Sequence, residues 1–469
     1  MLLDDYRREA EEFVSALDRD YYLQGSGQKE DLDVEDIYER HAGLFTHEAV
    51  EELRAEGRHE LALFAAQGLV GRETRTEQAE LARLEATLEV EGMPFRQAAV
   101  AQANEPDPAR RSELEAARLA TTARELDPLL VTMLERSHAV AEELGFESLR
   151  ELVEELGRVD LGRLHQQTEQ FLAATDPRDA APRLEAELGI AWGDARRSDL
   201  PAFFRAPSLD DLFPADRLLD AYEETRAALG LSAPGVRLDA VPRPTKSPRA
   251  FCAPVHVPDE VYLVIPRLGG REDYEALMHE AGHAEHFAHA DRELPFEHRY
   301  LGDNSVTEGY AFLLQHLVRD AGWLHARLGV EDAGEVEAHA RAERILFLRR
   351  YCAKLGYELE LHGPAPDLAA MPALYSERLS AASGLPWPEG SWIADVDAFF
   401  YAARYLRAWA LEELLRTELV RRFGAEWWNE PEAGALLSEL WREGQRRDAD
   451  ELLTGLTGAE LDFSKLVSA

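Results

Sequence analysis

His279, Glu280 and His283 form the pattern His-Glu-x-x-His, whose residue types and spacing could do chemistry directly. On a helix, side chains four residues apart lie on one face, so the two imidazoles can bind a single metal ion. Zn²⁺ prefers tetrahedral sites built from nitrogen and oxygen ligands. Glu280 lies beside the two histidines and can serve as a general base. The pattern therefore predicts a hydrolytic zinc site whose third protein ligand comes from another segment.

The residues before this pattern predict the helix that must carry it. Gly269 and Gly270 end the preceding apolar segment, and Glu272 and Asp273 place negative charge in the turn that follows. Acidic residues in a first turn favour a helix because they interact with the positive end of its dipole. We expect a helix that begins near residue 271 and continues through the pattern.

Glu308 is the best candidate for the third ligand. Residues 303–308 resemble a helix start, and an apolar run at 310–314 follows them. In the first turn of that helix the dipole favours the ionised carboxylate that a metal requires. Ser305 and Glu308 also fit a capping box, in which Glu308 would only accept a backbone hydrogen bond. We predict that the two histidines of the pattern and Glu308 hold one Zn²⁺ per chain.

Asp303 is the alternative acidic residue. In thermolysin-like enzymes the third ligand lies about this far beyond the second histidine, but there it is a glutamate. Asp303 could instead steady a histidine through the ring nitrogen that the metal leaves free, or it could simply cap the helix.

Two further histidines, His286 and His289, allow a different ligand set. Some zinc peptidases take a third histidine six residues after the second, and a glycine turns their chain back toward the metal. This chain has His286 where that glycine would be. If the helix continues, His289 lies about 15 Å along its axis from His279. We therefore expect His286 and His289 on a solvated helix face or a pocket rim.

A di-iron site is another alternative for the same residues. Glu280 and His283 match half of a di-iron helical bundle, and Glu135 and His138 could supply the other half. Two bridging glutamates would also be needed, and nothing in the sequence identifies them.

The predicted site indicates metal-assisted hydrolysis of an amide. A zinc ion with an open position lowers the pKa of its water toward neutrality. Glu280 can take a proton from that water and deliver it to the leaving amine.

A family resemblance rests on four features with a specific spacing. These are Ala-Phe-Cys at 250–252, the apolar run 261–265, the His279 pattern, and Glu308 at 25 residues beyond His283. Together they resemble the thimet oligopeptidase and oligoendopeptidase F family of zinc metallopeptidases. A weaker resemblance continues at 145–148, 198–200 and 399–409.

The resemblance implies a fold and a class of substrate. It implies a mainly helical, two-lobed clamshell with a deep active-site cleft and a small antiparallel sheet near the zinc-binding helix. Short or unfolded oligopeptides would be the substrates. Residues 261–265, with Tyr262, would form an edge strand on which a peptide backbone could pair. The same apolar run also fits an ordinary buried strand or helix end.

The chain departs from the family after the metal helices. Members place a histidine and tyrosines there to steady the oxyanion, whereas this chain has no histidine beyond His362. Tyr401 and Tyr405, four residues apart, are the predicted catalytic replacements. Arg404 and Arg407 are predicted to bind substrate, and a grip on a terminal carboxylate would make the enzyme a carboxypeptidase. These residues also fit the packed side of a helix with solvated arginines.

Composition limits the partners and the architecture. A formal net charge of −39 argues against binding to nucleic acid or to anionic membranes. A chain of 469 residues exceeds one simple core, so we predict lobes at 1–243 and 244–469, divided near the prolines at 242–244. The two cysteines, Cys252 and Cys352, do not indicate a disulfide framework.

The first residues and the hydropathy favour a cytoplasmic protein. Asp4 and Asp5 lie where a secretory signal would have its basic and apolar regions, and no apolar run approaches the length of a bilayer span. The sequence does not reveal the oligomeric state. We interpret the chain as a zinc metallopeptidase of oligopeptides; the alternatives are a helical zinc carboxypeptidase and a zinc-stabilised peptide-binding protein without catalysis.

Overall fold

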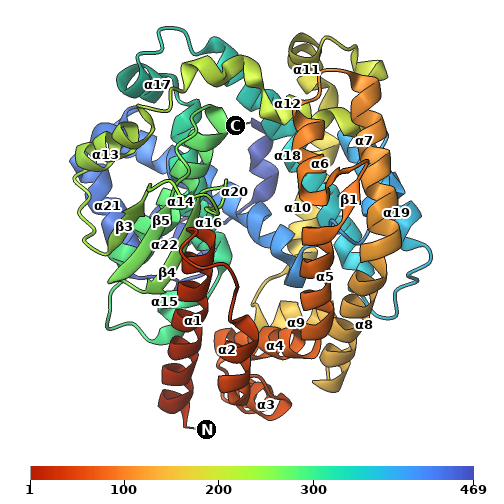
Figure 1. The fold of residues 1–469 in the computed structure, drawn as a ribbon. Coiled ribbons are helices and arrows are strands. Elements are labelled where there is room, and N and C mark those ends of the chain that lie inside the picture. The colour runs from red at the N-terminus through yellow and green to blue at the C-terminus, as the bar shows by residue number, and fades with distance from the viewer. Residues whose placement is uncertain (1, 469) are drawn as a thin grey trace. The chain divides into compact units, whose positions relative to one another are not determined.

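The structure, a computed structural model, describes residues 2–468 and consists mainly of helices (Figure 1). The chain forms two compact units. The first contains the residues up to Leu44, Pro207–Glu337, and the residues from Arg404 onward. The second contains Phe45–Ala206 and Ala338–Ala403. The predicted mainly helical fold with a small sheet is confirmed.

The division into units differs from the predicted lobes at 1–243 and 244–469. Two of the unit boundaries fall inside the helices α18 (Gly334–Leu361) and α20 (Tyr401–Phe423). The predicted boundary relied on a proline-rich connection. A boundary inside a continuous helix has no proline or glycine to mark it, so the sequence does not reveal it.

The first unit contains the sheet and the helices that carry the His279 pattern and Glu308. Its helices are α1 (Leu3–Gly25), α2 (Val34–Arg40), α13 (Leu218–Ala228), α14 (Arg271–His289), α15 (Phe296–Tyr300), α16 (Asn304–His316), α17 (Ala321–Leu328), α21 (Pro431–Arg442), α22 (Ala449–Thr457) and most of α20. Its strands are β3 (Val236–Asp239), β4 (Phe251–His256) and β5 (Glu260–Val264).

The second unit is helical apart from one two-stranded ladder. Its helices are α3 (His47–Ala55), α4 (His59–Glu73), α5 (Arg75–Thr87), α6 (Phe95–Asn104), α7 (Pro108–Thr121), α8 (Asp127–Glu143), α9 (Leu149–Leu156), α10 (Leu161–Ala174), α11 (Ala181–Leu188), α12 (Leu200–Arg205), α19 (Met371–Ser383) and most of α18. The ladder pairs β1 (Glu89–Val90) with β2 (Met93–Pro94). Leu346, Tyr357 and Leu379 lie in a buried core to which α18 and α19 both contribute.

The sheet of the first unit has the strand order β3-β5-β4. β4 pairs with β5 in antiparallel orientation, as predicted, but β3 pairs with β5 in parallel. The sheet is therefore mixed rather than wholly antiparallel.

The predicted edge strand is the central strand. Residues 261–264 lie in β5, which has β3 on one side and β4 on the other. β4 is an edge strand, and its sequence contains Pro254. Proline has no N–H to donate to a ladder, so within sheets it is confined to edges, strand starts and bulges. The prediction that residues 261–265 form the edge was wrong, and Pro254 was the signal that pointed to β4.

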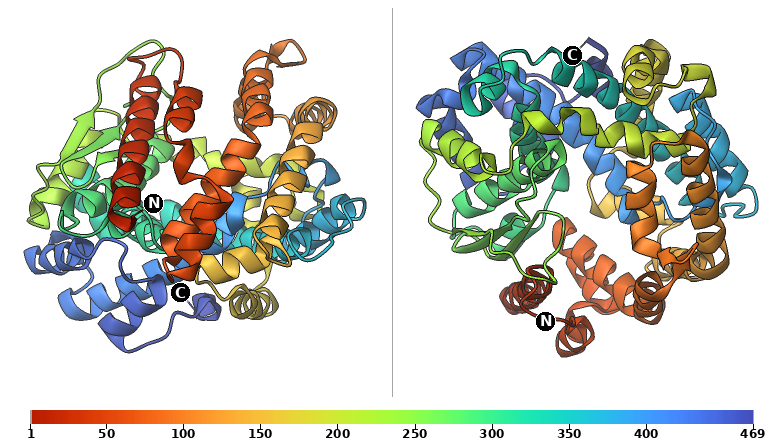
Figure 2. Two further views of the ribbon diagram at one scale, coloured as in Figure 1. Left: turned by 90° about the horizontal axis from the view of Figure 1, so that it is seen from below. Right: turned by 45° about the horizontal axis from the view of Figure 1, so that its top comes forward.

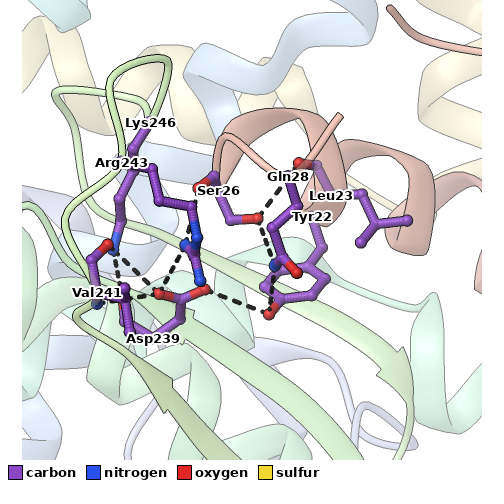
Figure 3. Close-up of polar contacts among 8 residues, drawn as sticks. All are labelled: Tyr22, Leu23, Ser26, Gln28, Asp239, Val241, Arg243 and Lys246. Atoms are coloured by element: carbon purple, nitrogen blue, oxygen red, sulfur yellow. Dashed lines mark hydrogen bonds and ion pairs between the residues drawn. The ribbon is translucent and has the colours of Figure 1, made fainter. Parts of the chain in front are cut away.

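Helix α1 packs against β4, and the left view of Figure 2 shows this red helix beside the green strands of the sheet. The ring of Tyr22 on α1 stacks on that of Tyr262 on β5, with centroids 3.6 Å apart. Figure 3 shows that Tyr22 also donates to the buried Asp239, at 3.3 Å. Arg243 and Lys246 donate to the same carboxylate. These contacts fix the C-terminal end of α1 to the sheet.

Helices α14 and α16 pack closely because of one glycine. A Cβ atom at Gly282 would lie 2.5 Å from the Cα of Ala311 and 2.6 Å from the carbonyl oxygen of Tyr310. Only a residue without a side chain permits this approach of the two backbones. The glycine inside the His279 pattern thus brings the helix of Glu308 against the helix of the histidines.

Among residues 2–468, no helix combines the length and the apolar character that crossing a membrane would require.

Candidate metal centre

The functional side chains of α14 lie on its accessible stripe. His279, Glu280 and His283 are half-buried, whereas Met278 and Ala281, adjacent in the sequence, are buried. Burial of an unpaired polar side chain costs free energy. These three residues lie instead at accessible positions of the helix, where a ligand can reach them. The predicted helix and the predicted common face are both observed.

Glu308 joins the two histidines from the first turns of α16. One of its carboxylate oxygens, Oε2, lies 3.3 Å from Nε2 of His279 and 3.6 Å from Nε2 of His283. One donor atom from each of the three residues falls within 4.8 Å of the others, a grouping that could hold a metal ion. The structure therefore brings together the three residues that the sequence predicts as ligands.

Each histidine is oriented by a second contact. Nδ1 of His279 lies 3.0 Å from Oε1 of Gln315, and Nδ1 of His283 lies 2.8 Å from the hydroxyl of Thr307. If each Nδ1–H donates to its oxygen, Nε2 is the ring nitrogen that faces Glu308. Partners of this kind fix the tautomer and orientation of metal-binding histidines.

Sequence reasoning missed Thr307 and Gln315, although a signal for both was present. Thr307 immediately precedes Glu308, and Gln315 follows it by seven residues. Two helical turns separate Glu308 from Gln315, so both lie on the same face of α16.

The electrostatics suit a carboxylate ligand. Burial alone would raise the pKa of Glu308, but the close contacts with the imidazoles of His279 and His283 outweigh burial and lower the pKa well below its usual range. Glu308 is thus held in the ionised form. A donor set of two imidazole nitrogens and one carboxylate fits Zn²⁺.

Glu280 contacts the edge of the sheet. Its Oε2 accepts a hydrogen bond from the backbone N–H of Cys252 on β4, at 2.9 Å. This amide donates out of the sheet, because β4 pairs with β5 on its other side. The contact orients the carboxylate and leaves Oε1 to accept a proton. Burial and the charge of Glu280 raise the pKa of the Cys252 thiol, which therefore stays neutral.

Asp303 forms the N-cap of α16. Its Oδ1 accepts from the backbone N–H of Ser305 at 3.0 Å, so the capping box predicted between Ser305 and Glu308 does not form. Arg404 donates to Oδ1 at 2.9 Å and Arg407 to Oδ2 at 2.7 Å. Asp303 is consequently neither the third ligand nor the partner of a histidine.

These contacts also reassign the two arginines. Arg404 and Arg407 are buried and are directed at the cap of α16, and Arg407 pairs in addition with Asp450 at 2.7 Å. Their predicted solvated or substrate-binding positions are not supported, because both guanidinium groups hold the helix that carries Glu308. The carboxypeptidase alternative, which depended on these arginines, loses its basis.

The three predicted tyrosines have different surroundings. The ring of Tyr405 lies 5.9 Å from that of Phe312, which in turn lies 5.1 Å from the ring of His279. Tyr401 begins α20 and belongs to the second unit. Tyr262 donates to Glu260 at 2.7 Å, and its ring is covered by α1, so its predicted role in substrate binding is not supported.

The alternative ligand sets do not assemble. α14 continues as a helix through His286 and His289; the ring of His286 is buried against Tyr310, and Nδ1 of His289 lies 2.8 Å from the carbonyl oxygen of Glu285.

The residues proposed as the other half of a di-iron site, Glu135 and His138, lie in the second unit. His138 of α8 is hydrogen-bonded to His362, with 3.0 Å between their ring nitrogens. In the described part of the chain, Glu135 and His138 do not belong to a grouping of potential metal ligands.

Comparison with known proteins identifies the fold. No model of a protein family matches the chain, and no curated protein matches it. Among solved structures, it is similar to a crystal structure described as a putative oligoendopeptidase F from Bacillus anthracis str. Ames. The two share 16% sequence identity and superimpose with a TM-score of 0.61, over 96% of this chain and 83% of the other. The chain therefore has a helical oligoendopeptidase-like fold.

Proposed function

We propose that this protein is a zinc metallopeptidase that cleaves peptide bonds in short or unfolded oligopeptides. The observation that carries the proposal is the convergence of His279, His283 and Glu308 beside the oriented carboxylate of Glu280. The similarity of fold to a protein described as an oligoendopeptidase supports the choice of substrate class.

Each residue of the centre has a role in this reaction. His279, His283 and Glu308 would hold one zinc ion, which when bound lowers the pKa of water and polarises an amide carbonyl. Glu280 accepts a proton at its oxygen that does not face Cys252, and it then delivers that proton to the leaving amine.

The edge of β4 supports binding of an extended substrate. Because the Cys252 amide already donates outward to Glu280, the outer edge of β4 lies beside the catalytic carboxylate. An extended peptide can add to such an edge through backbone hydrogen bonds. β4 thus takes the role that the sequence had suggested for residues 261–265.

Tyr405 is proposed to supply a hydroxyl to the developing oxyanion, because Phe312 connects its ring to that of His279. The same role for Tyr401 stays a prediction. A cytoplasmic location and the absence of nucleic-acid and membrane partners also stay predictions.

Substitution of the general base tests the proposal. We expect Glu280→Gln to bind zinc as the wild type does and to lose peptide hydrolysis, because an amide cannot accept the proton. Zinc content by mass spectrometry and product mapping on a mixed peptide library measure both properties. Glu293→Gln, at an exposed glutamate, is the matched control. Undiminished hydrolysis by Glu280→Gln contradicts the assignment; zinc binding without hydrolysis by the wild type favours a non-catalytic binding protein.

A further inference from the structure

The first half of α20 has one accessible stripe. Tyr405 and Trp409, four residues apart, are half-buried, while residues 402–404 and 406–408 between and around them are buried. Phe312 on α16 is likewise half-buried, between the buried Ala311 and Leu313. Large aromatic side chains therefore occupy the accessible positions of two otherwise buried helix segments.

The three rings form one continuous surface, which we call the aromatic shelf (Phe312, Tyr405 and Trp409). The ring of Phe312 stacks on that of Trp409 with centroids 5.2 Å apart, and Tyr405 stacks on Trp409 at 5.9 Å. The ring of His279 packs against Phe312 at 5.1 Å, in an edge orientation. The aromatic shelf therefore begins at a metal-ligand histidine and extends away from it along α20.

The charges near the aromatic shelf are paired with one another. Nδ1 of His316 lies 3.7 Å from Oε1 of Glu412, and Arg416 donates to the same carboxylate at 2.8 Å. The shelf itself carries no ionised side chain. Binding of an apolar group over such a half-exposed surface is favourable, because burial of apolar area and ring stacking both contribute to the binding free energy.

We infer that the aromatic shelf is the subsite for an aromatic or large aliphatic side chain of the peptide, adjacent to the bond that is cut. The inference rests on the proposed function and specifies its substrate class. Continuity with His279 places the bound side chain beside the hydrolytic centre, so it sets where the peptide is cleaved. Tyr405 contributes the face of its ring to this subsite.

Peptide binding to zinc-loaded Glu280→Gln tests the inference without turnover. The probes are capped alanine pentapeptides in which one position is alanine, phenylalanine, leucine or lysine. We expect the phenylalanine and leucine peptides to bind about tenfold more tightly than the all-alanine peptide, which is the gain typical of burying one such side chain. Isothermal titration calorimetry gives the dissociation constants. In the wild type, cleavage should fall at a fixed offset from phenylalanine.

A second substitution locates the preference. Combined with Glu280→Gln, Trp409→Ala should abolish most of the difference between the phenylalanine and alanine peptides, whereas Trp409→Phe, which keeps a ring, should retain it. Zinc content verifies that both variants keep the centre intact.

Equal affinity for all peptides, tightest binding of the lysine peptide, or an unchanged preference in Trp409→Ala would overturn the inference. Cleavage without preference contradicts the aromatic shelf alone; preferential binding without cleavage by the wild type contradicts the peptidase proposal and leaves the shelf standing.

Discussion

At the scale of residues, two of the three candidate ligands are restrained at a second point. Gln315 holds the ring of His279 and Thr307 holds that of His283, and both come from α16, the helix that carries Glu308. Such preorganisation matters because an outer partner of a metal-binding histidine fixes both its orientation and its tautomer.

Removal of the Thr307 hydroxyl should weaken zinc binding. Loss of an outer partner typically costs about 10- to 100-fold in metal affinity, so we expect Thr307→Val to lose zinc affinity by such a factor. Competition with a chromophoric zinc chelator measures the dissociation constant. Thr307→Ser keeps a hydroxyl and should bind zinc like the wild type. Equal affinities for the valine and serine variants would show that His283 does not depend on this contact.

Removal of the Tyr405 hydroxyl should affect the chemical step. If that hydroxyl donates to the oxyanion, Tyr405→Phe should lower kcat by about 100- to 1,000-fold and change KM little. The ring remains, so the preference for a phenylalanine peptide should persist. Steady-state kinetics with one such peptide provides both values. An unchanged kcat would exclude the hydroxyl from catalysis and leave only the role of the ring.

At the scale of elements, the packing of α14 on α16 brings the ligands together. Gly282 and Ala311 form the close contact, and the pairs of Asp303 with Arg404 and Arg407 fix the N-terminal end of α16. Both sets of contacts fix the positions of the helices and do not involve the metal-binding side chains directly.

A methyl group at Gly282 should separate the two helices. Overpacking of this kind typically costs about 1–3 kcal/mol, and the Cβ of Gly282→Ala would meet backbone atoms that cannot rotate away. We expect a lower free energy of unfolding together with weaker zinc binding, measured by urea denaturation and chelator competition. Gly43→Ala is the matched control, because a Cβ there has nothing within 4 Å. Wild-type zinc affinity in Gly282→Ala would contradict the packing argument.

Helix α18 contains a buried charge cluster in the second unit. Lys354 pairs with Asp397 at 2.8 Å, and its Nζ lies 3.8 Å from Glu358. Glu358 is fully buried and accepts from the backbone N–H of Asp397 at 2.9 Å. Burial outweighs the attraction of Lys354 and raises the pKa of Glu358 to about 8.

This raised pKa predicts a pH dependence of stability. Between the ordinary pKa of 4.5 and about 8, the folded chain holds a proton on Glu358 that the unfolded chain has lost. Stability therefore falls as pH rises through this window, by up to about 1.4 kcal/mol per pH unit. The raised pKa of Lys354 and the lowered pKa of Asp395 leave both groups charged throughout the window.

Glu358→Gln tests this pH dependence, because an amide does not titrate. Relative to the wild type, the variant should become progressively more stable from pH 5 to pH 8, as followed by the Tm of each protein in this window. A constant difference in Tm across that range would mean that Glu358 is already ionised at pH 5.

At the scale of the whole molecule, the sequence predicted those parts that depend on local geometry. His279, Glu280 and His283 share a face because of helical periodicity, and Glu308 was found because it starts the next long helix. β3 and β5 pair in parallel although they come from separate segments of the chain. No local sequence pattern specifies which strand pairs with which.

The roles of Arg404 and Arg407 were missed for a similar reason. Their partner Asp303 precedes Arg404 by 101 residues and Arg407 by 104 residues. The sequence around an arginine next to tyrosines on a helix is compatible both with a solvated side chain and with a buried, paired one. The division into units was missed because the chain passes between them within α18 and α20.

Metal removal should destabilise the whole protein. A ligand present at about 1,000 times its dissociation constant stabilises the folded state by about 4 kcal/mol, so a chelator should lower Tm and abolish hydrolysis, and added Zn²⁺ should restore both. His279→Ala is the control whose Tm should not respond to zinc. A Tm that is insensitive to zinc in the wild type would indicate that the metal is not bound by the folded state.

Anomalous X-ray diffraction at the zinc absorption edge tests the central claim most directly. Crystals grown with Zn²⁺ should show one anomalous peak per chain, within bonding distance of Nε2 of His279, Nε2 of His283 and the carboxylate of Glu308. Absence of that peak, or a zinc ion held by other side chains, would contradict the account.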